Sequence, residues 1–376
     1  MNLEHKTKLN APVRIGFYLG RMSGPGSGAW TWLYALLGEL VQRKDIEIVV
    51  FASEKMQASF NCYSSLSFVV TEQTNAAVSL VRNGFLLNKI VEEHQLDALH
   101  LCSLPIPRRL TCKVFYTLHD LRAYYRKEIG GGTSKDIFRK LFYKYMVKRA
   151  DVIICPSNWA KTDVNEKLSI DLQKILVVPQ MLNSLSEKNE DKSTSEQQNY
   201  RYVLALGHIE VRKNLETLVR ATQSDSWPTD VTLRIVGKDF GHRDKLKEIY
   251  QIDPRNSVVF ESEVDETQKS NLISRSELVL VPSHIEGFGI VTVEAIMLGV
   301  PVLVSDQTAL PEVVGTPQAI IEVMNVQKWA SRVRDLCANP ELRNDLLKTE
   351  RLALNEKSDK KTVDKLLDAY VAKVRS

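Results

Sequence analysis

The chain lacks the cysteine patterns that hold small secreted proteins or structural zinc sites together. Its five cysteines are odd in number and widely scattered, and no C-x-x-C pair occurs. This excludes a disulfide framework and a cysteine-bound structural zinc, and it is typical of reduced thiols in the cytosol. We therefore expect a cytoplasmic protein.

Long apolar runs are absent as well. No stretch approaches the roughly 18 apolar residues of a membrane-spanning helix, and the opening residues contain no apolar core of a signal peptide. Hydrophobic residues make up 44% of the chain and charged residues 26%, the balance of a folded globular protein. At 376 residues the chain is too long for one ordinary core, so two domains are expected.

Positive charge is unevenly distributed along the chain. Residues 1–184 hold 24 Lys and Arg against 16 Asp and Glu, whereas residues 185–376 hold 26 against 30. Residues 101–150 alone carry 12 basic and three acidic side chains, so this segment accounts for the whole excess. We expect an anionic partner to meet the first domain, and we expect no nucleic-acid partner.

The basic segment 122–149 contains a helix-like stretch, SKDIFRKLFYKYMVKRA. Its apolar residues fall along one side of such a helix: Ile137, Phe138, Leu141, Phe142 and Tyr145. The stripe can pack on the domain while the charges stay in water. Alternatively, the helix can lie on an anionic membrane surface or meet a lipid-linked acceptor, which would place the protein on the inner face of the membrane.

Apolar runs that fit buried strands alternate with stretches that fit helices, a pattern typical of parallel α/β sheets. In the first half, strands are expected at residues 13–20, 46–52, 96–101, 113–118, 152–155 and 175–178. In the second half, they are expected at residues 201–207, 232–237, 257–260, 278–283 and 301–305. The fold class is therefore α/β, with two Rossmann-like, doubly wound domains.

A polar segment separates the two sets of strands. Residues 184–199, SLSEKNEDKSTSEQQN, lack aromatic and β-branched aliphatic residues, so they cannot bury a face and are expected to be a linker. This gives a first domain over residues 1–183 and a second over residues 200–355. The stretch 356–376 is expected to end the chain as a helix that packs on one or both domains.

The most informative segment is residues 279–315, VLVPSHIEGFGIVTVEAIMLGVPVLVSDQTALPEVVG. It predicts a strand ending at Ser283, a glycine-rich loop over residues 284–290, and a helix from about Val291 that Gly299 stops. Loops at the carboxyl ends of parallel strands hold ligands, and helix N-termini offer amide groups to anions. We expect this loop to hold a phosphorylated ligand.

This segment resembles the retaining GT-B glycosyltransferases of family 4, also called group 1, whose pattern is E-G-F-G-x-x-x-x-E-A-x-x-x-G-x-P-V. Glu286 and Glu294 match its two glutamates, and the remaining markers are all present. The resemblance implies two domains facing across a cleft, with acceptor in the first and nucleotide sugar in the second. Glu286 would contact the donor sugar, and Glu294 the ribose hydroxyls. Backbone amides would hold the sugar and diphosphate at Gly287, Phe288, Gly289, Ile290 and Val291.

Without the pattern, Glu286 can be read as a solvated loop acid, and Glu294 as a residue that offsets the helix dipole. A second match supports the functional interpretation. The segment HIEVRKN resembles the family's R-K-N segment, so Lys213, and next Arg212, would place positive charge on the donor diphosphate. Many relatives carry an arginine where this chain has His208.

The first domain contributes two weaker matches. Ser27 and Gly28 match the start of the family's S-G-x-G-R-Y segment and would approach the diphosphate from the opposite side, although this glycine-rich stretch can also be a simple turn. His119 and Asp120 match its H-D after a strand, which implies that His119 hydrogen-bonds the donor sugar near its reacting carbon. Farther along, Ser157 is expected to cap a helix.

The resemblance implies a retaining hexosyltransferase that uses a GDP- or UDP-linked sugar of mannose or glucose type. The acceptor would be a saccharide or lipid-linked molecule, in cell-surface polysaccharide or glycolipid synthesis. The proposed catalytic residues are His119, Lys213 and Glu286. No D-x-D motif occurs, so neither metal nor another cofactor is expected. A non-catalytic nucleotide-sugar-binding partner subunit and a nucleotide-sugar epimerase on a similar fold remain alternatives.

Overall fold

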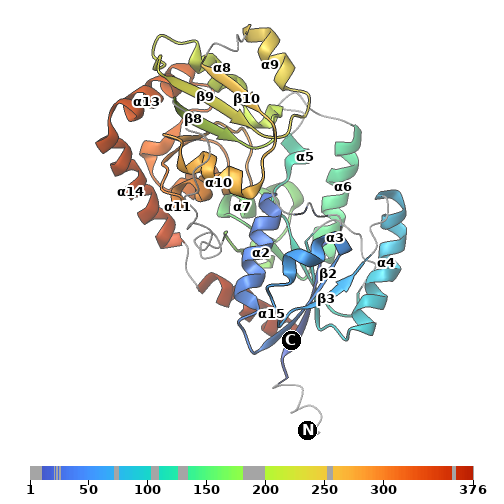
Figure 1. Cartoon of the computed structure of the whole chain (residues 1–376). Coiled ribbons are helices and arrows are strands. Elements are labelled where there is room, and N and C mark those ends of the chain that lie inside the picture. The colour runs from blue at the N-terminus through green and yellow to red at the C-terminus, as the bar shows by residue number, and fades with distance from the viewer. Residues whose placement is uncertain are drawn as a thin grey trace, which may run out of the picture.

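The structure is a computed structural model that describes residues 11–20, 22, 24, 27–71, 76–102, 110–125, 134–180, 200–251, 257–357 and 361–375. It contains two parallel sheets, each with helices on both faces (Figure 1). This confirms the expected two-domain α/β fold. The expected linker, residues 184–199, lies outside the described residues.

The first sheet has seven parallel strands in the order β3-β2-β1-β4-β5-β6-β7. They are β1 (Val13–Tyr18), β2 (Ile46–Ala52), β3 (Ser67–Val70), β4 (Ala98–Leu101), β5 (Lys113–Thr117), β6 (Val152–Cys155) and β7 (Ile175–Val177). Around them lie α2 (Gly28–Leu40), α3 (Glu54–Gln57), α4 (Ala76–Glu93), α5 (Arg122–Tyr125), α6 (Ser134–Arg149) and α7 (Asn158–Leu168). The chain order reverses direction between β1 and β4, which is where ligands bind in open α/β sheets.

The second sheet has six parallel strands in the order β10-β9-β8-β11-β12-β13. They are β8 (Arg201–Leu206), β9 (Val231–Val236), β10 (Val258–Glu261), β11 (Val279–Val281), β12 (Val302–Ser305) and β13 (Ile320–Ile321). Its helices are α8 (Leu215–Thr222), α9 (Arg243–Tyr250), α10 (Glu266–Ser274), α11 (Ile290–Met297), α12 (Leu310–Val314), α13 (Val326–Ala338) and α14 (Pro340–Lys357). Here the reversal falls between β8 and β11, so the loops that follow these two strands are neighbours.

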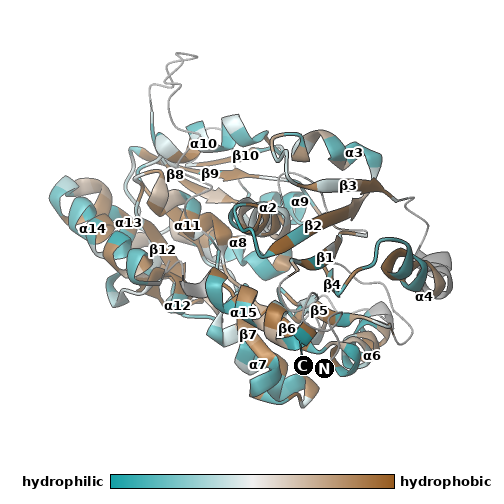
Figure 2. Ribbon diagram, turned by 90° about the horizontal axis from the view of Figure 1, so that it is seen from below, coloured by the Kyte–Doolittle hydropathy of each residue, from teal (hydrophilic) through white to brown (hydrophobic). Residues whose placement is uncertain are grey.

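The strands are apolar because helices cover both faces of each sheet. Figure 2 shows hydrophobic strands enclosed by helices whose outer sides are hydrophilic. Strand β1 illustrates the rule, since five of its six residues are buried. No helix in the described part of the chain is long and apolar enough to cross a bilayer.

The last helix, α15 (Lys361–Arg375), returns to the first sheet, where it lies beside α2 in Figure 1. Its buried residues Val363, Leu366, Leu367 and Tyr370 belong to the same apolar cluster as β1 and β2. The Tyr370 hydroxyl is hydrogen-bonded to Nδ1 of the buried His100. The chain therefore crosses from one domain to the other twice, which ties the two halves together at their ends.

One buried acid stabilises the second domain in a pH-dependent way. Glu350 on α14 is fully buried, and its oxygens accept the backbone N–H of Val302, at the start of β12, at 3.2 and 3.3 Å. Burial raises the pKa of Glu350 to about 9, although the Val302 hydrogen bond opposes the shift. The folded protein therefore holds this group protonated at neutral pH.

We predict that Glu350→Gln raises the melting temperature at pH 8 but changes it little at pH 5. A pKa raised on folding favours the native state below the unfolded value of 4.5, and that benefit is lost as pH rises toward 9. The glutamine amide is neutral at both pH values, so the variant does not lose stability in this way as pH rises. Thermal unfolding at both pH values tests this, with the exposed Glu356→Gln on the same helix as control. Equal stabilisation at both pH values would contradict the assignment.

Candidate functional site

The centre of the site is the carboxylate of Glu286, in the loop after β11. Its Oε1 accepts a hydrogen bond from Ser283 at 3.0 Å, and its backbone N–H donates to Oγ1 of Thr308 at 3.0 Å. The side chain is only 12% exposed. A buried carboxylate needs compensating charge, and the neighbouring loop supplies it.

Two cations from the loop after β8 enclose this carboxylate. Lys213 Nζ lies 2.5 Å from Oε1 of Glu286, and Arg212 Nη1 lies 3.2 Å from Oε2. Burial by itself would raise the pKa of Glu286, but Lys213 and Arg212 outweigh it and lower the pKa to about 2. The predicted sugar-binding acid and the predicted diphosphate cations thus form one largely buried ion cluster.

Asn214 fixes the conformation of the loop after β8, which carries Arg212 and Lys213. It adopts the left-handed conformation, with φ of 51°. Its side-chain amide donates to the carbonyl oxygens of Pro282 and Val323, each at 3.0 Å. These bonds tie the loop after β8 to the end of β11, so the third residue of the R-K-N segment has a structural task that sequence reasoning had not assigned.

His119 and Asp120 approach from the first domain, after β5. The imidazole packs edge-on against Trp32, with ring centroids 5.3 Å apart, and its Nε2 is buried without a hydrogen-bond partner among the described residues. Burial lowers the pKa of His119 to about 4, despite the opposing charge of Asp120, so the ring is neutral at physiological pH. Arg122 donates two side-chain hydrogen bonds of 3.0 Å to the carboxylate of Asp120.

The two domains touch where these groups meet. A Cβ on Gly287 would lie 1.8 Å from the carbonyl oxygen of His119, so only glycine fits. Ser157 caps α7, as predicted, and also donates to the carbonyl oxygen of Gly287 at 2.8 Å. Gly28 faces the start of α11, with its Cβ position 3.0 Å from Ile290. The motifs of both domains therefore converge on one place.

Glu312 on α12 forms a further contact between the domains. One of its oxygens accepts both the backbone N–H and the side-chain amide of Asn158, at 2.8 and 2.9 Å, and the other accepts the backbone N–H of Trp159 at 2.9 Å. An acid at a helix N-terminus is favourable because it meets unpaired N–H groups and the positive end of the dipole. Sequence reasoning had not singled out this glutamate.

Comparison with known proteins agrees with this geometry. The family model described as Glycosyltransferase Family 4 matches residues 26–183, and the one described as Glycosyl transferases group 1 matches residues 186–352. The chain belongs to the group 1, family 4 glycosyltransferases. Sequence had implied this family from the E-G-F-G and R-K-N segments, and the matches confirm it.

Several characterised glycosyltransferases are similar to this one. The O-antigen chain mannosyltransferase RfbU of Salmonella typhimurium is 22% identical over 331 residues, which cover 85% of this chain and 89% of RfbU. The serotype-specific mannosyltransferase WbdA of Escherichia coli is 25% identical over 237 residues, or 59% of this chain and 28% of WbdA.

Solved structures share the fold at low identity. Anabaena HepE, determined in complex with UDP-glucose, superposes with a TM-score of 0.70 at 18% identity, covering 96% of this chain and 99% of HepE. The lipopolysaccharide glycosyltransferase WaaG superposes with a TM-score of 0.65 at 16% identity, covering 95% and 99% of the two chains. This glycosyltransferase therefore has the expected GT-B architecture.

The second glutamate of the motif lies apart from the ion cluster. Glu294 is on α11, only 5% exposed, and its Oε1 accepts from Lys269 Nζ of α10 at 2.8 Å. The amides of residues 287–291, which the resemblance had implicated, belong to the loop and first turn that lead into this helix. Lys269 was not predicted, because its own helix carries no family marker.

Two residues from the sequence analysis have mainly local contacts. Ser27 caps α2 by accepting from Trp30 at 3.3 Å and also donates to Gly24 at 3.2 Å. His208 is about half exposed and packs against Phe240 with tilted rings, at 4.7 Å between ring centroids. Burial lowers the pKa of His208 against the opposing charge of Glu210.

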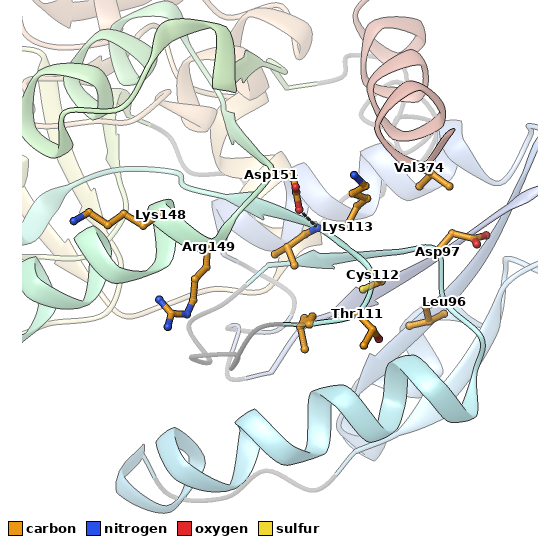
Figure 3. Close-up of a pocket in the computed structure, with 11 residues that line it drawn as sticks. Leu96, Asp97, Thr111, Cys112, Lys113, Lys148, Arg149, Asp151 and Val374 are labelled. Atoms are coloured by element: carbon orange, nitrogen blue, oxygen red, sulfur yellow. Dashed lines mark hydrogen bonds between the residues drawn. The ribbon is translucent and has the colours of Figure 1, made fainter. Parts of the chain in front are cut away.

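A separate pocket of about 630 Å³ (Figure 3) lies at the amino-terminal edge of the first sheet. His119 follows the carboxyl end of β5 and so lies at the opposite edge. Lys148 and Arg149 of α6 and Val374 of α15 stand around it, as Figure 3 shows. Asp97 and Asp151, also in its wall, accept the backbone N–H groups of β1 and β5 at 2.8 Å. The pocket shares no residue with the site.

No group of three or more His, Cys, Asp or Glu side chains that could hold a metal ion gathers anywhere in the described ranges. The charged groups of the site are instead the Glu286 cluster and the Asp120–Arg122 pair.

We predict that Gly287→Ala separates the domains locally and lowers glycosyl transfer by about a hundredfold or more, because its methyl group would overlap the carbonyl of His119. Hydrogen exchange should rise in residues 284–291 but not in the core strands. Gly24→Ala is the matched control, since its nearest neighbour, Met56, is 3.9 Å away. Unchanged exchange and unchanged transfer would show that the contact is not needed.

Proposed function

We propose that this glycosyltransferase is a retaining, metal-independent hexosyltransferase. It transfers a mannose- or glucose-type unit from a GDP- or UDP-linked donor to a saccharide or lipid-linked acceptor in cell-surface polysaccharide or glycolipid synthesis. The observation that carries this is the largely buried cluster of Lys213, Arg212 and Glu286, the last of which directly precedes in sequence the close contact between Gly287 and the His119 carbonyl. The names of RfbU and WbdA support a mannosyl donor, and the HepE complex supports UDP-glucose.

The cluster suits departure of a nucleoside diphosphate. Negative charge grows on the diphosphate as the bond to the sugar breaks, so a fixed cation stabilises the transition state more than the ground state. Lys213 and Arg212 are held in place by Glu286 and need no reorganisation when that charge develops. In this proposal they supply the positive charge that a divalent metal provides in other enzymes.

The remaining groups would orient the donor. The amides at the start of α11 would donate to the diphosphate, and Glu294 would accept hydrogen bonds from the ribose hydroxyls. His119 would hydrogen-bond the sugar through its buried Nε2, and its neutral state suits contact with a hydroxyl. Because Glu286, Lys213 and His119 are all present, a decayed, non-catalytic site is the weaker alternative.

The site suggests a way to separate chemistry from binding. We predict that Glu286→Gln lowers transfer by about a hundredfold or more, similar to the loss of one hydrogen bond that stabilises a transition state, but does not weaken binding of UDP or GDP. Removing the carboxylate's charge leaves Lys213 and Arg212 free to meet phosphate. Lys213→Met should lower turnover more than donor affinity. Calorimetry and transfer assays on folded variants test this, and an equal loss of affinity and transfer in Glu286→Gln would contradict it.

Helix α6 supports a role at a membrane surface. The predicted single apolar stripe is wrong in part, because Phe142 packs into the core whereas Ile137, Phe138 and Leu141 are exposed by 66%, 57% and 63%. The helix turns inward along Tyr143, Met146 and Val147 instead. We propose that the exposed trio, called here the α6 tip, enters the headgroup region of an anionic bilayer on the inner face of the membrane.

Basic residues along α6 fit this occupant. Lys144 is exposed just after the tip, Lys148 is exposed near the end of the helix, and Lys140 lies over the ring of Tyr124 at 4.9 Å. Each basic residue near an anionic leaflet contributes about 1 kcal/mol, screened by salt. The apolar tip would insert into the headgroup region, and the lysines would favour anionic over neutral lipids.

We predict that the protein sediments with anionic vesicles far more than with neutral ones, and that high salt releases it. Phe138→Ser combined with Leu141→Ser should weaken vesicle binding by about tenfold or more, because two exposed apolar side chains lose burial in lipid. Leu352→Ser on α14, 58% exposed, is the matched control. Equal binding to both kinds of vesicle, or an unaltered result in the double variant, would overturn the proposal.

A further inference from the structure

The buried acid Glu294 depends on a cation from another helix. Its side chain is only 6% exposed, and that of Lys269 is 17% exposed. Their charged atoms are 2.8 Å apart, a short charge-assisted hydrogen bond. Glu266, one turn before Lys269 on α10, pairs with the same ammonium group at 2.8 Å but is more exposed, at 39%. Lys269 therefore stands between a buried and a half-exposed carboxylate.

The fold holds Lys269 in this position. Helix α10 starts with a capping box, in which Asp265 accepts from the backbone of Gln268 at 2.8 Å and Gln268 accepts from the backbone of Asp265 at 3.1 Å. The box fixes the first turn, from which Lys269 extends toward α11. Burial lowers the pKa of Lys269, but Glu294 and Glu266 outweigh it and raise the pKa above its usual value, so the side chain stays charged.

The charge of Lys269 has a direct consequence for Glu294. A buried carboxylate without a counter-charge either takes up a proton or moves toward water. A protonated carboxyl can no longer accept hydrogen bonds from two hydroxyls, and a displaced one no longer meets them. Lys269 thus sets both the ionisation state and the orientation of Glu294.

We infer that Lys269 is a positioning residue for ribose recognition: by pairing with Glu294 it keeps that carboxylate ionised and aimed at the vicinal hydroxyls of the donor nucleotide. This rests on the proposed nucleotide-sugar function and on Glu294 as the ribose-binding acid. Lys269 itself does not contact the nucleotide in this arrangement. Its loss should therefore affect selectivity for ribose rather than affinity for diphosphate.

The test compares UDP with 2′-deoxy-UDP, and GDP with 2′-deoxy-GDP, by calorimetry on the full chain. The wild type should bind the preferred ribonucleotide about tenfold or more tightly than its deoxy form, because a buried acceptor loses a hydroxyl partner. In Lys269→Met the ribonucleotide should weaken by about the same factor while the deoxy form changes little, so the preference disappears. Glu266→Gln, which leaves the pair with Glu294 intact, should retain the preference.

A second variant guards against misfolding. Lys269→Gln keeps a hydrogen-bond donor of shorter reach, and it should lose most of the ribose preference, whereas Lys269→Arg should restore part of it. Failure of the wild type to bind UDP and GDP would overturn the proposed function itself. A wild type that prefers ribose, with a preference that survives in both Lys269→Met and Lys269→Gln, would overturn only this inference. Equal weakening of ribo and deoxy forms would overturn it as well.

Discussion

The site depends on the burial of one carboxylate between two cations. Glu286 is largely buried, and Lys213 and Arg212, at 2.5 and 3.2 Å from its oxygens, outweigh the effect of burial and lower its pKa. Breaking such a cluster leaves an uncompensated buried charge, so its members constrain one another strongly. The loops after β8 and β11 must therefore meet, and the strand order β8-β11 brings them together at the point where the sheet reverses direction.

The first domain contributes to the site through close backbone contacts with the second domain. Gly287 lies so near the carbonyl of His119 that no side chain fits between them, and Ser157 and Glu312 bond across the same boundary. These contacts bring the backbone of His119 against the residue that follows Glu286, while the His119 ring packs on Trp32. A sugar held there would have cations on its leaving group and a histidine beside it, while the acceptor would come from the first domain, whose α6 carries the exposed apolar tip.

Many of the strands and site residues could be predicted from the sequence because their patterns are local. Strands β2 and β6 were predicted with their observed bounds, since β6 is a continuous apolar run and β2 is apolar apart from Glu47. Strand β13 has only two residues, and β3 follows a serine-rich stretch, so neither gave a clear signal.

Lys269 was missed because its partner is 25 residues away, and Glu350 was missed because an acid on a polar helix resembles an exposed surface residue. The inward face of α6 was misjudged because Tyr143, Met146 and Val147 compete with the predicted stripe, and only the sheet beneath decides between them.

The central claim is that the cluster of Glu286, Lys213 and Arg212 serves transfer of a sugar from a nucleoside diphosphate. The most direct measurement is product analysis with GDP- and UDP-linked hexoses labelled in the sugar, together with a membrane or oligosaccharide acceptor fraction. The account predicts release of the nucleoside diphosphate and label in a new glycoside that keeps the donor's anomeric configuration. Label that remains on the nucleotide, whether as an epimerised sugar or as unchanged donor under conditions where the nucleotide binds, would contradict it.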